Sequence, residues 1–246
     1  DKNFNLLMQD KYDEIDSNSL IYQNYKYFLD RIKNLEESIE NFYDALQRLE
    51  GVSVTLDKDD DAQMIFESLN STGQDLTDVD LIRNYLLMNC APAEQDDLYN
   101  DYWIKLEKIL KKDFTDFVRD YLSLKNGVVV QNGKNKVYSA FKKYYYNNYI
   151  SQQIGLESFL NEWIVYANAY SMLITPSDKR EKKYILENAL NDTIMLNIKT
   201  TYPFLLGIMH DYINGKIDNE ETAGILRLIE SYAVRRSICG IQGGAL

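Results

Sequence analysis

The spacing of apolar residues predicts helices along most of the chain. Between residues 25 and 49, apolar side chains recur at alternating steps of three and four, which is the spacing of one helical face about seven turns long. The residues of this face are Tyr25, Phe28, Ile32, Leu35, Ile39, Phe42, Leu46 and Leu49. The pattern predicts one long helix or two helices with a break near Asn34. This helical arm would be covered by its own bundle, which we favour, or by a second arm in a coiled-coil dimer.

A different pattern follows the arm. Val52, Val54 and Leu56 alternate with Ser53 and Thr55, and this period of two predicts a short, half-buried strand. A single strand needs neighbours, and few candidates follow it. We therefore expect the rest of the sheet to precede Asp1, and the chain to be an interior piece of a longer protein.

A helix-loop-helix is predicted between residues 62 and 87. Its first helix presents Ile65, Phe66 and Leu69 on one face, and the segment from Asn70 to Gln74 ends that helix. Thr77, followed three residues later by Asp80, resembles a capping box and would start the second helix.

From Pro92 onward the pattern predicts only helices and short connections. Helical faces contain residues 98–110, 114–122, 137–145, 159–167, 184–190, 203–214 and 218–240. We therefore predict a mainly α fold, a multi-helix bundle with a long helical arm and one or two short strands. The expected domains are residues 1–91, which hold the arm, the strand and the helix-loop-helix, and residues 92–246, which form the bundle.

The composition of the chain argues against several kinds of functional site. The chain has only three Pro and 11 Gly in 246 residues, as expected of a helical protein, and its net charge of −11 argues against a freestanding nucleic-acid binder. The two cysteines, Cys90 and Cys239, suggest no disulfide framework. With His210 as the single histidine, a His-rich zinc site or a His-Asn-His nuclease cannot be completed within the chain. We expect no metal site in this chain.

Common sequence motifs for phosphate, dinucleotide and zinc binding, and segments that enter membranes, are also missing from the sequence. The sequence contains no GxxxxGK[ST], GxGxxG or CxxC motif. No apolar run approaches the roughly 20 residues of a membrane span, and no signal peptide opens the chain. We expect a cytoplasmic protein that does not enter a membrane.

One segment is locally basic. Residues 121–156 contain five lysines and no Asp or Glu, which leaves −16 on the rest of the chain because the total is −11. The candidate DNA contacts in this segment are Lys134, Lys136, Lys142, Lys143 and Tyr145. The alternative is a solvated helix whose tyrosines pack inward. Arg235 and Arg236 are a second basic spot, where the arginines would bind phosphate or the negative end of their own helix.

The helix-loop-helix carries a family resemblance. Phe66, Glu67, Asn70, Gly73, Leu76, Asp80 and Leu81 stand in the pattern Phe-Glu-x-x-Asn-x-x-Gly-x-x-Leu-x-x-x-Asp-Leu. This pattern resembles the signature of the GmrSD restriction endonuclease N-terminal domain family, whose ParB-like domain carries a DGQQR motif. The segment from Val234 to Gly240 is similar to an Arg-Arg segment late in these proteins.

The resemblance implies a prokaryotic defence protein that recognises modified foreign DNA. Such a protein would hydrolyse a nucleoside triphosphate at its DGQQR site, with a divalent metal, and cut DNA with a C-terminal His-Asn-His nuclease. This chain has neither a DGxxR sequence nor the histidines of that nuclease. The resemblance therefore implies a middle fragment with no catalytic residue and no cofactor of its own, flanked by the two active domains.

By the same resemblance, four residues are carried over as supports of the nucleotide site: Asn70, Gly73, Asp80 and Arg83. The alternative is that they only shape the turn between two helices. Two functions remain open for the whole chain. The first is the helical linker and sensing region of a modification-dependent restriction endonuclease, which would contact DNA. The second is a non-catalytic module that binds a partner protein. Enzymatic activity of the chain itself and its oligomeric state are left open.

Overall fold

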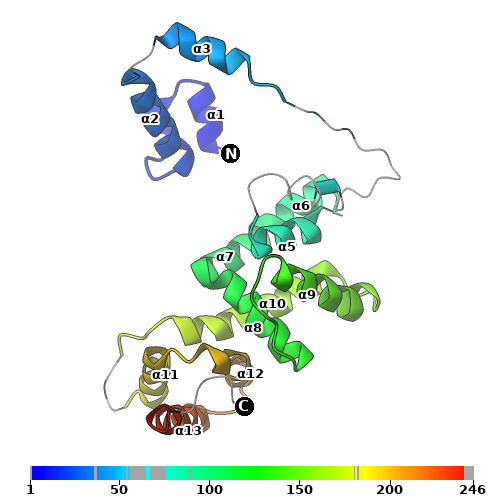
Figure 1. Ribbon diagram of the computed structural model, residues 1–246, viewed down its shortest axis with the longest axis vertical. Coiled ribbons are helices and arrows are strands. Elements are labelled where there is room, and N and C mark those ends of the chain that lie inside the picture. Colours follow the sequence, from blue (N-terminus) through cyan, green and yellow to red (C-terminus); the bar gives the residue numbers. More distant parts are fainter. Residues whose placement is uncertain are drawn as a thin grey trace. The chain divides into compact units, whose positions relative to one another are not determined.

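The computed structural model of this chain is mainly α-helical (Figure 1). It describes residues 2–35, 38–51, 53, 55, 65–66, 76–88, 90–179, 181 and 183–240. No strand occurs among these residues, so the one or two short strands expected from the sequence are not seen. Val52, Val54 and Leu56, on which that expectation rested, lie outside the described residues.

The chain divides into two compact units, residues 1–58 and 59–246. The helices of the first unit are α1 (Lys2–Met8), the 3-10 turn η1 (Tyr12–Glu14), α2 (Leu20–Lys33) and α3 (Ile39–Gln47). The arm is thus two helices, and the predicted break near Asn34 is confirmed. The Asn34 side chain donates a hydrogen bond to the Asp30 carbonyl oxygen at 2.9 Å, and the Ser38 hydroxyl caps the next helix by accepting from the Asn41 N–H at 3.2 Å.

The apolar face of the arm is exposed within the first unit. α1 packs on α2, and the Tyr12 ring stacks on the Tyr25 ring with centroids 5.6 Å apart. The remaining residues of the face are exposed, among them Phe28 and Ile39 at 62% and 66%. The cover that we expected from the arm's own bundle is therefore not found within this unit. The coiled-coil dimer stays a prediction.

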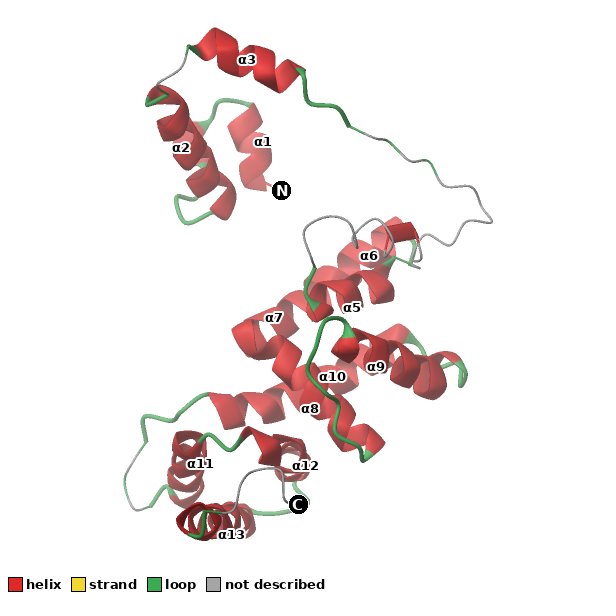
Figure 2. Ribbon diagram, in the orientation of Figure 1, coloured by secondary structure: helices red, strands yellow, loops and turns green. Residues whose placement is uncertain are grey.

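The second unit is a bundle of helices (Figure 2). Its described elements are α5 (Asp78–Leu87), α6 (Pro92–Leu98), the π-helical turn η2 (Tyr99–Trp103), α7 (Ile104–Leu110), the 3-10 turn η3 (Lys111–Asp113), α8 (Phe114–Asn126), α9 (Lys136–Tyr145), the π-helical turn η4 (Tyr146–Ile150), α10 (Leu156–Ile174), α11 (Ile185–Leu196), the 3-10 turn η5 (Lys199–Thr201), α12 (Tyr202–Ile213) and α13 (Asn219–Ile238). The helical segments predicted from Pro92 onward are all present.

Several helix ends follow from local chemistry. α10 ends one residue before Thr175, because the following Pro176 disfavours a helical conformation at that residue. α13 begins with a capping box in which the Asp218 carboxylate accepts from the Glu221 N–H at 2.9 Å and the Glu221 carboxylate accepts from the Asp218 N–H at 3.0 Å.

Aromatic side chains fill the core of the second unit. Trp163, in the middle of α10, is fully buried. Six rings surround it with centroids between 4.8 and 6.4 Å away: Trp103, Phe114, Phe117, Tyr121, Phe141 and Phe159. These rings come from η2, α8, α9 and α10 itself. One tryptophan therefore joins residues that lie up to 60 positions apart in the sequence.

A buried ion pair lies beside this core. Asp120, only 2% exposed, bonds Arg119 at 2.9 Å and accepts a hydrogen bond from the Tyr170 hydroxyl at 3.0 Å. Burial raises the pKa of Asp120, although the adjacent guanidinium opposes the shift. The two partners supply the hydrogen bonds that a buried carboxylate requires.

The packing divides the chain earlier than the sequence suggested. α5 lies before the expected domain boundary at residue 91, yet it packs on α8 and α9 of the bundle. As a boundary between parts of separate function, residue 91 stays a prediction. In the part of the chain that the structure describes, none of the helices combines the length and apolar composition needed to cross a bilayer.

Removal of the central ring should destabilise the second unit. We expect Trp163→Ala to lower the free energy of unfolding by about 3–5 kcal/mol, because it removes buried apolar surface and leaves a cavity. Urea unfolding followed by circular dichroism would measure the change. Tyr146→Ala, at a residue that is 57% exposed, is the control and should change stability by less than about 0.5 kcal/mol. A change below about 1 kcal/mol for Trp163→Ala would contradict this view of the core.

Candidate functional site

The capping box that was predicted to start the second helix of the helix-loop-helix is confirmed at the start of α5. The Asp80 N–H donates to the Thr77 hydroxyl oxygen at 3.2 Å, and the Thr77 N–H donates to the Asp80 carboxylate at 3.3 Å. This reciprocal capping box fixes the first turn of α5. Both oxygens of Asp80 are engaged, since the second lies 3.1 Å from the Arg83 guanidinium.

Arg83 joins α5 to α7. Its guanidinium lies 3.5 Å from the Glu107 carboxylate, which also accepts a hydrogen bond from the Trp103 indole N–H at 2.8 Å. Asp80 and Arg83 therefore fix the start of α5 and dock it on the bundle. Asn70 and Gly73, the other two carried-over positions, lie outside the described residues.

The N-terminal end of α5 caps another helix. The Asp78 carboxylate accepts a hydrogen bond from the Tyr138 N–H at 2.9 Å, in the first turn of α9. A helix N-terminus leaves backbone donors unpaired and carries a partial positive charge, so a carboxylate is a favourable partner there. Burial nevertheless raises the pKa of Asp78, and the hydrogen bond from Tyr138 opposes that shift.

A second contact joins the same two helices. The Tyr85 ring of α5 meets three rings of α9 edge to face, with centroids 6.2 to 6.4 Å apart: Tyr138, Phe141 and Tyr145. Together with the Asp78 cap, this contact fixes α9 against the helix that carries the end of the family signature.

α9 and the following turn have two distinct faces. At 100° per residue, one face holds buried residues and the opposite face holds exposed ones. The buried set is Val137, Tyr138, Phe141, Tyr144, Tyr145 and Tyr149. Tyr145 is only 7% exposed and stacks on Phe141, so it is not placed to stack on a nucleic-acid base. The alternative in which tyrosines pack inward holds for this residue.

The exposed face forms a stripe of Lys136, Ser139, Lys143 and Tyr146, which we call the basic stripe. Lys134 precedes it in the loop before α9 and is also exposed. Tyr146 was not among the candidate DNA contacts chosen from the sequence. The signal that places it on this face is its position three residues after Lys143, at the spacing of one helical turn.

Two other lysines of the segment are engaged elsewhere. Lys142 lies over the Tyr85 and Tyr138 rings at 5.7 and 5.2 Å from their centroids. Lys125 forms an ion pair with Glu162 at 2.7 Å. The absence of acidic residues from 121–156 in the sequence therefore overstates the positive charge of the folded segment.

Three side chains donate to the Glu162 carboxylate. Besides Lys125, it accepts hydrogen bonds from the Tyr149 hydroxyl at 2.6 Å and the Tyr121 hydroxyl at 3.1 Å. Burial alone would raise the pKa of Glu162, but these donors, Lys125 first, outweigh burial and lower it. The cluster holds η4 and α8 against α10, and its phenols have raised pKa values because they are buried.

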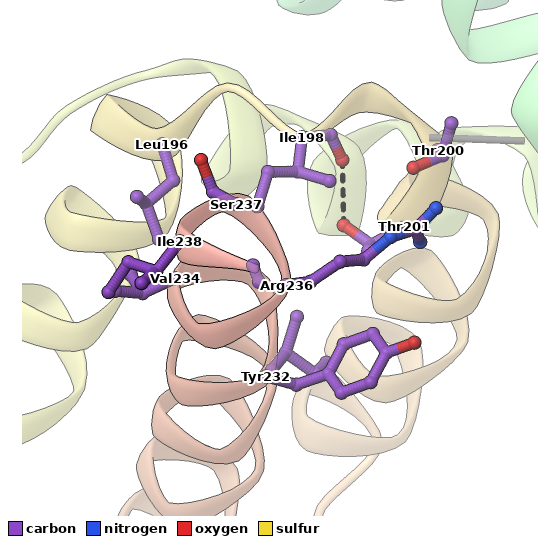
Figure 3. Close-up of a pocket in the computed structure, with 11 residues that line it drawn as sticks. Leu196, Ile198, Thr200, Thr201, Tyr232, Val234, Arg236, Ser237 and Ile238 are labelled. Atoms are coloured by element: carbon purple, nitrogen blue, oxygen red, sulfur yellow. Dashed lines mark hydrogen bonds between the residues drawn. The ribbon is translucent and has the colours of Figure 1, made fainter. Parts of the chain in front are cut away.

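Arg235 and Arg236 lie on a different part of the bundle. α13 packs mainly on α11 and α12, whereas α9 packs on α5 and α8. Two adjoining hollows of about 410 and 590 Å³ lie along α13 and share Thr200, Thr201, Ile229 and Tyr232. Figure 3 shows Arg236 extending from α13 toward Thr201, whose hydroxyl donates to the Ile198 carbonyl oxygen at 2.8 Å. Arg235 lines the second hollow.

No group of three or more His, Cys, Asp or Glu side chains that could hold an ion occurs in the described ranges. Asp80 and Arg83 are engaged with each other and with Thr77 and Glu107. Their contacts hold the first turn of α5 in place.

The Asp78 cap leads to a test with a matched pair of substitutions. Asp78→Ala should lower the free energy of unfolding by about 1 kcal/mol, the usual contribution of a capping side chain. Asp78→Asn keeps an acceptor oxygen and removes a half-buried charge, so its stability should equal or exceed that of the parent chain at pH 7.

The pH dependence of this pair has a defined sign. Because the pKa of Asp78 is raised in the folded state, the cost of burying its charge exists above that pKa and is relieved as the pH falls. The stability difference between Asp78→Asn and the parent chain should therefore shrink toward about pH 4. Urea unfolding at both pH values measures it. An Asn variant as unstable as the Ala variant at pH 7 would contradict the capping role.

Comparison with known proteins identifies the N-terminal part of the chain. No curated protein and no solved structure matches the chain. The family model of the GmrSD restriction endonuclease N-terminal domain matches residues 1–87, a range that ends with the last residue of α5. The likeness of the later Arg-Arg segment to these proteins stays a prediction. Residues 1–87 therefore match the GmrSD restriction endonuclease N-terminal domain family, which confirms the resemblance read from Phe66 to Leu81.

Proposed function

We propose that this chain is the helical linker and sensing region of a modification-dependent restriction endonuclease of prokaryotic defence. One observation carries the proposal: α5, the last helix within the family match, is fixed directly to α9, which bears the basic stripe. In this view the chain catalyses nothing by itself, and relays a signal between a nucleotide-hydrolysing site and a His-Asn-His nuclease, both supplied by other segments.

The contacts between α5 and α9 suit such a relay. The Asp78 carboxylate bonds the α9 backbone, and the Tyr85 ring packs against α9 side chains. A close-packed contact transmits a displacement, because interiors pack at crystal-like density and have little room to absorb it. A shift of α5 would therefore move α9, and with it Lys136 and Lys143.

The basic stripe is the proposed DNA contact. Lysines bind backbone phosphates and release counterions, while an exposed tyrosine such as Tyr146 can stack on a base or pack on a sugar. The rest of the chain is acidic and repels DNA, so the stripe would also orient the protein on its ligand.

We further propose an indirect role for Asp80 and Arg83 at the nucleotide site. Their capping box and ion pairs fix the entry of α5. They would therefore set how the chain enters α5 from the segment that contains Asn70 and Gly73, and would not themselves contact nucleotide or metal.

A second function is favoured by a different observation. Large apolar side chains are exposed on two surfaces, the α2–α3 arm and the outer side of α13, where Leu228 and Ile238 are 74% and 81% exposed. Exposed apolar surface of this kind marks protein interfaces. A protein-interaction module is the alternative, and it requires no DNA binding.

A charge-reversal experiment separates the two functions. We expect the chain to bind a 20-base-pair duplex in a salt-dependent manner, measured by fluorescence anisotropy. Lys136→Glu with Lys143→Glu should weaken binding by about tenfold or more and reduce the slope of log affinity against log salt by about two, one for each lost phosphate contact.

The matched control reverses the charge of two exposed lysines on α7, Lys105 and Lys108. Because the phosphate contacts would be retained, Lys105→Glu with Lys108→Glu should leave the salt slope unchanged. Salt-dependent binding that is equally weak in both variants would reduce the stripe to a general charge effect. No binding by the parent chain would remove the DNA role and favour the interaction module.

A further inference from the structure

The loop between α8 and α9 presents two adjacent valines to solvent. Val128 and Val129 are 70% and 77% exposed, among the most exposed large apolar side chains of the second unit. Figure 2 shows this connection as the loop that leaves the end of α8 and returns to the start of α9. Burial of a valine side chain is worth about 1.5–3 kcal/mol, so an exposed pair is a surface on which a ligand can gain affinity.

The loop is held in place at its base. Gly127, with φ +66°, ends α8 in the left-handed conformation and turns the chain out of the helix. The Val130 N–H donates to the Ser123 hydroxyl oxygen at 2.9 Å, and Ser123 in turn donates to the Arg119 carbonyl oxygen at 2.7 Å.

A second bond holds the far side of the loop. The Arg119 guanidinium donates to the Asn132 side-chain oxygen at 3.1 Å. Arg119 is itself fixed by ion pairs with Asp116 and Asp120 at 2.7 and 2.9 Å. The two valines therefore lie at the start of the loop, between Gly127 and the bonded Val130, and Asn132 is bonded to α8 as well. Little ordering entropy would be lost when a ligand covers them.

The valines lie next to the start of the basic stripe. One hollow of about 420 Å³ is lined by both valines, by Lys134 and Lys136, and by Ser139 of α9. Lys143 lies two helical turns further along the same face, about 10 Å from Lys136 at 1.5 Å per residue. The two valines and the lysines thus form one continuous surface.

We propose that the Val128–Val129 loop enters a groove of the duplex DNA that is bound along the basic stripe, where the valines pack against sugars and base edges. This inference rests on the proposed DNA contact of the stripe. Apolar side chains beside basic ones recur where proteins enter the minor groove, since the lysines hold the phosphates on the groove walls while the apolar group contacts its floor.

Charge and position favour DNA over a protein partner for this loop. The hollow that the valines line also contains Lys134 and Lys136, and no acidic side chain is among its lining residues. Lysine is depleted from the cores of protein interfaces, whereas a nucleic-acid groove is bounded by phosphates on both sides.

The test replaces both valines by serine, in the full chain. We expect Val128→Ser with Val129→Ser to weaken binding of the 20-base-pair duplex about tenfold, equivalent to about 1.4 kcal/mol. The slope of log affinity against log salt should not change, because valines release no counterions. Circular dichroism should be unchanged, since the replaced side chains are exposed.

A matched control removes two exposed apolar side chains from another face: Met195→Ser with Leu228→Ser, at residues that are each 74% exposed. This control should bind DNA like the parent chain. Unchanged affinity of the valine variant, or an equal loss of affinity in the control, would overturn the loop proposal. Neither result would affect the DNA contact of the basic stripe, which the lysine variants test separately. A change in salt slope for the valine variant would also overturn it, because the valines would then only position the lysines. If the parent chain bound no duplex, both the proposed function and this inference would fail.

Discussion

The burial of one face of α9 is the constraint on which the position of the basic stripe depends. Phe141 packs on Trp163, and Tyr138 packs on Tyr85. Since a helix has a fixed angular step, burial of these rings forces Lys136 and Lys143 to the opposite side. The aromatic core thus does more than stabilise the second unit. It determines which lysines of the segment face solvent and which, like Lys125, are taken up by internal partners.

The region matched by the family and the remaining bundle are joined by chemistry typical of one folded unit. The Asp78 cap, the Arg83–Glu107 ion pair and the Tyr85 ring contacts all cross from α5 into elements beyond residue 87. A family boundary in sequence is therefore not a boundary in packing. Exchange of α5 between related proteins would have to preserve these partners, because each would otherwise leave a polar or aromatic group without its neighbour.

Local chemistry explains which features could be predicted from sequence. Helix positions from Pro92 onward, the break near Asn34 and the capping box of Thr77 and Asp80 depend on neighbours within a few residues, so periodicity and capping rules located them. The fate of individual side chains depends on distant partners. Tyr145, a candidate DNA contact, is buried against Tyr85 of α5 and Phe159 of α10. Lys125 is paired with Glu162. Tyr146 was not among the candidate contacts, and its exposure depends on which side of α9 packs on Trp163.

The placement of the tryptophans has a practical consequence. The chain contains two, Trp103 and Trp163, and their rings lie 6.4 Å apart inside the second unit. The first unit contains tyrosine and phenylalanine as its only aromatic side chains. Intrinsic tryptophan emission is therefore a label for the second unit alone. Unfolding of residues 1–58 would leave that emission unaltered while it changed the helical dichroism, so comparison of the two signals can establish whether the units melt together or one before the other.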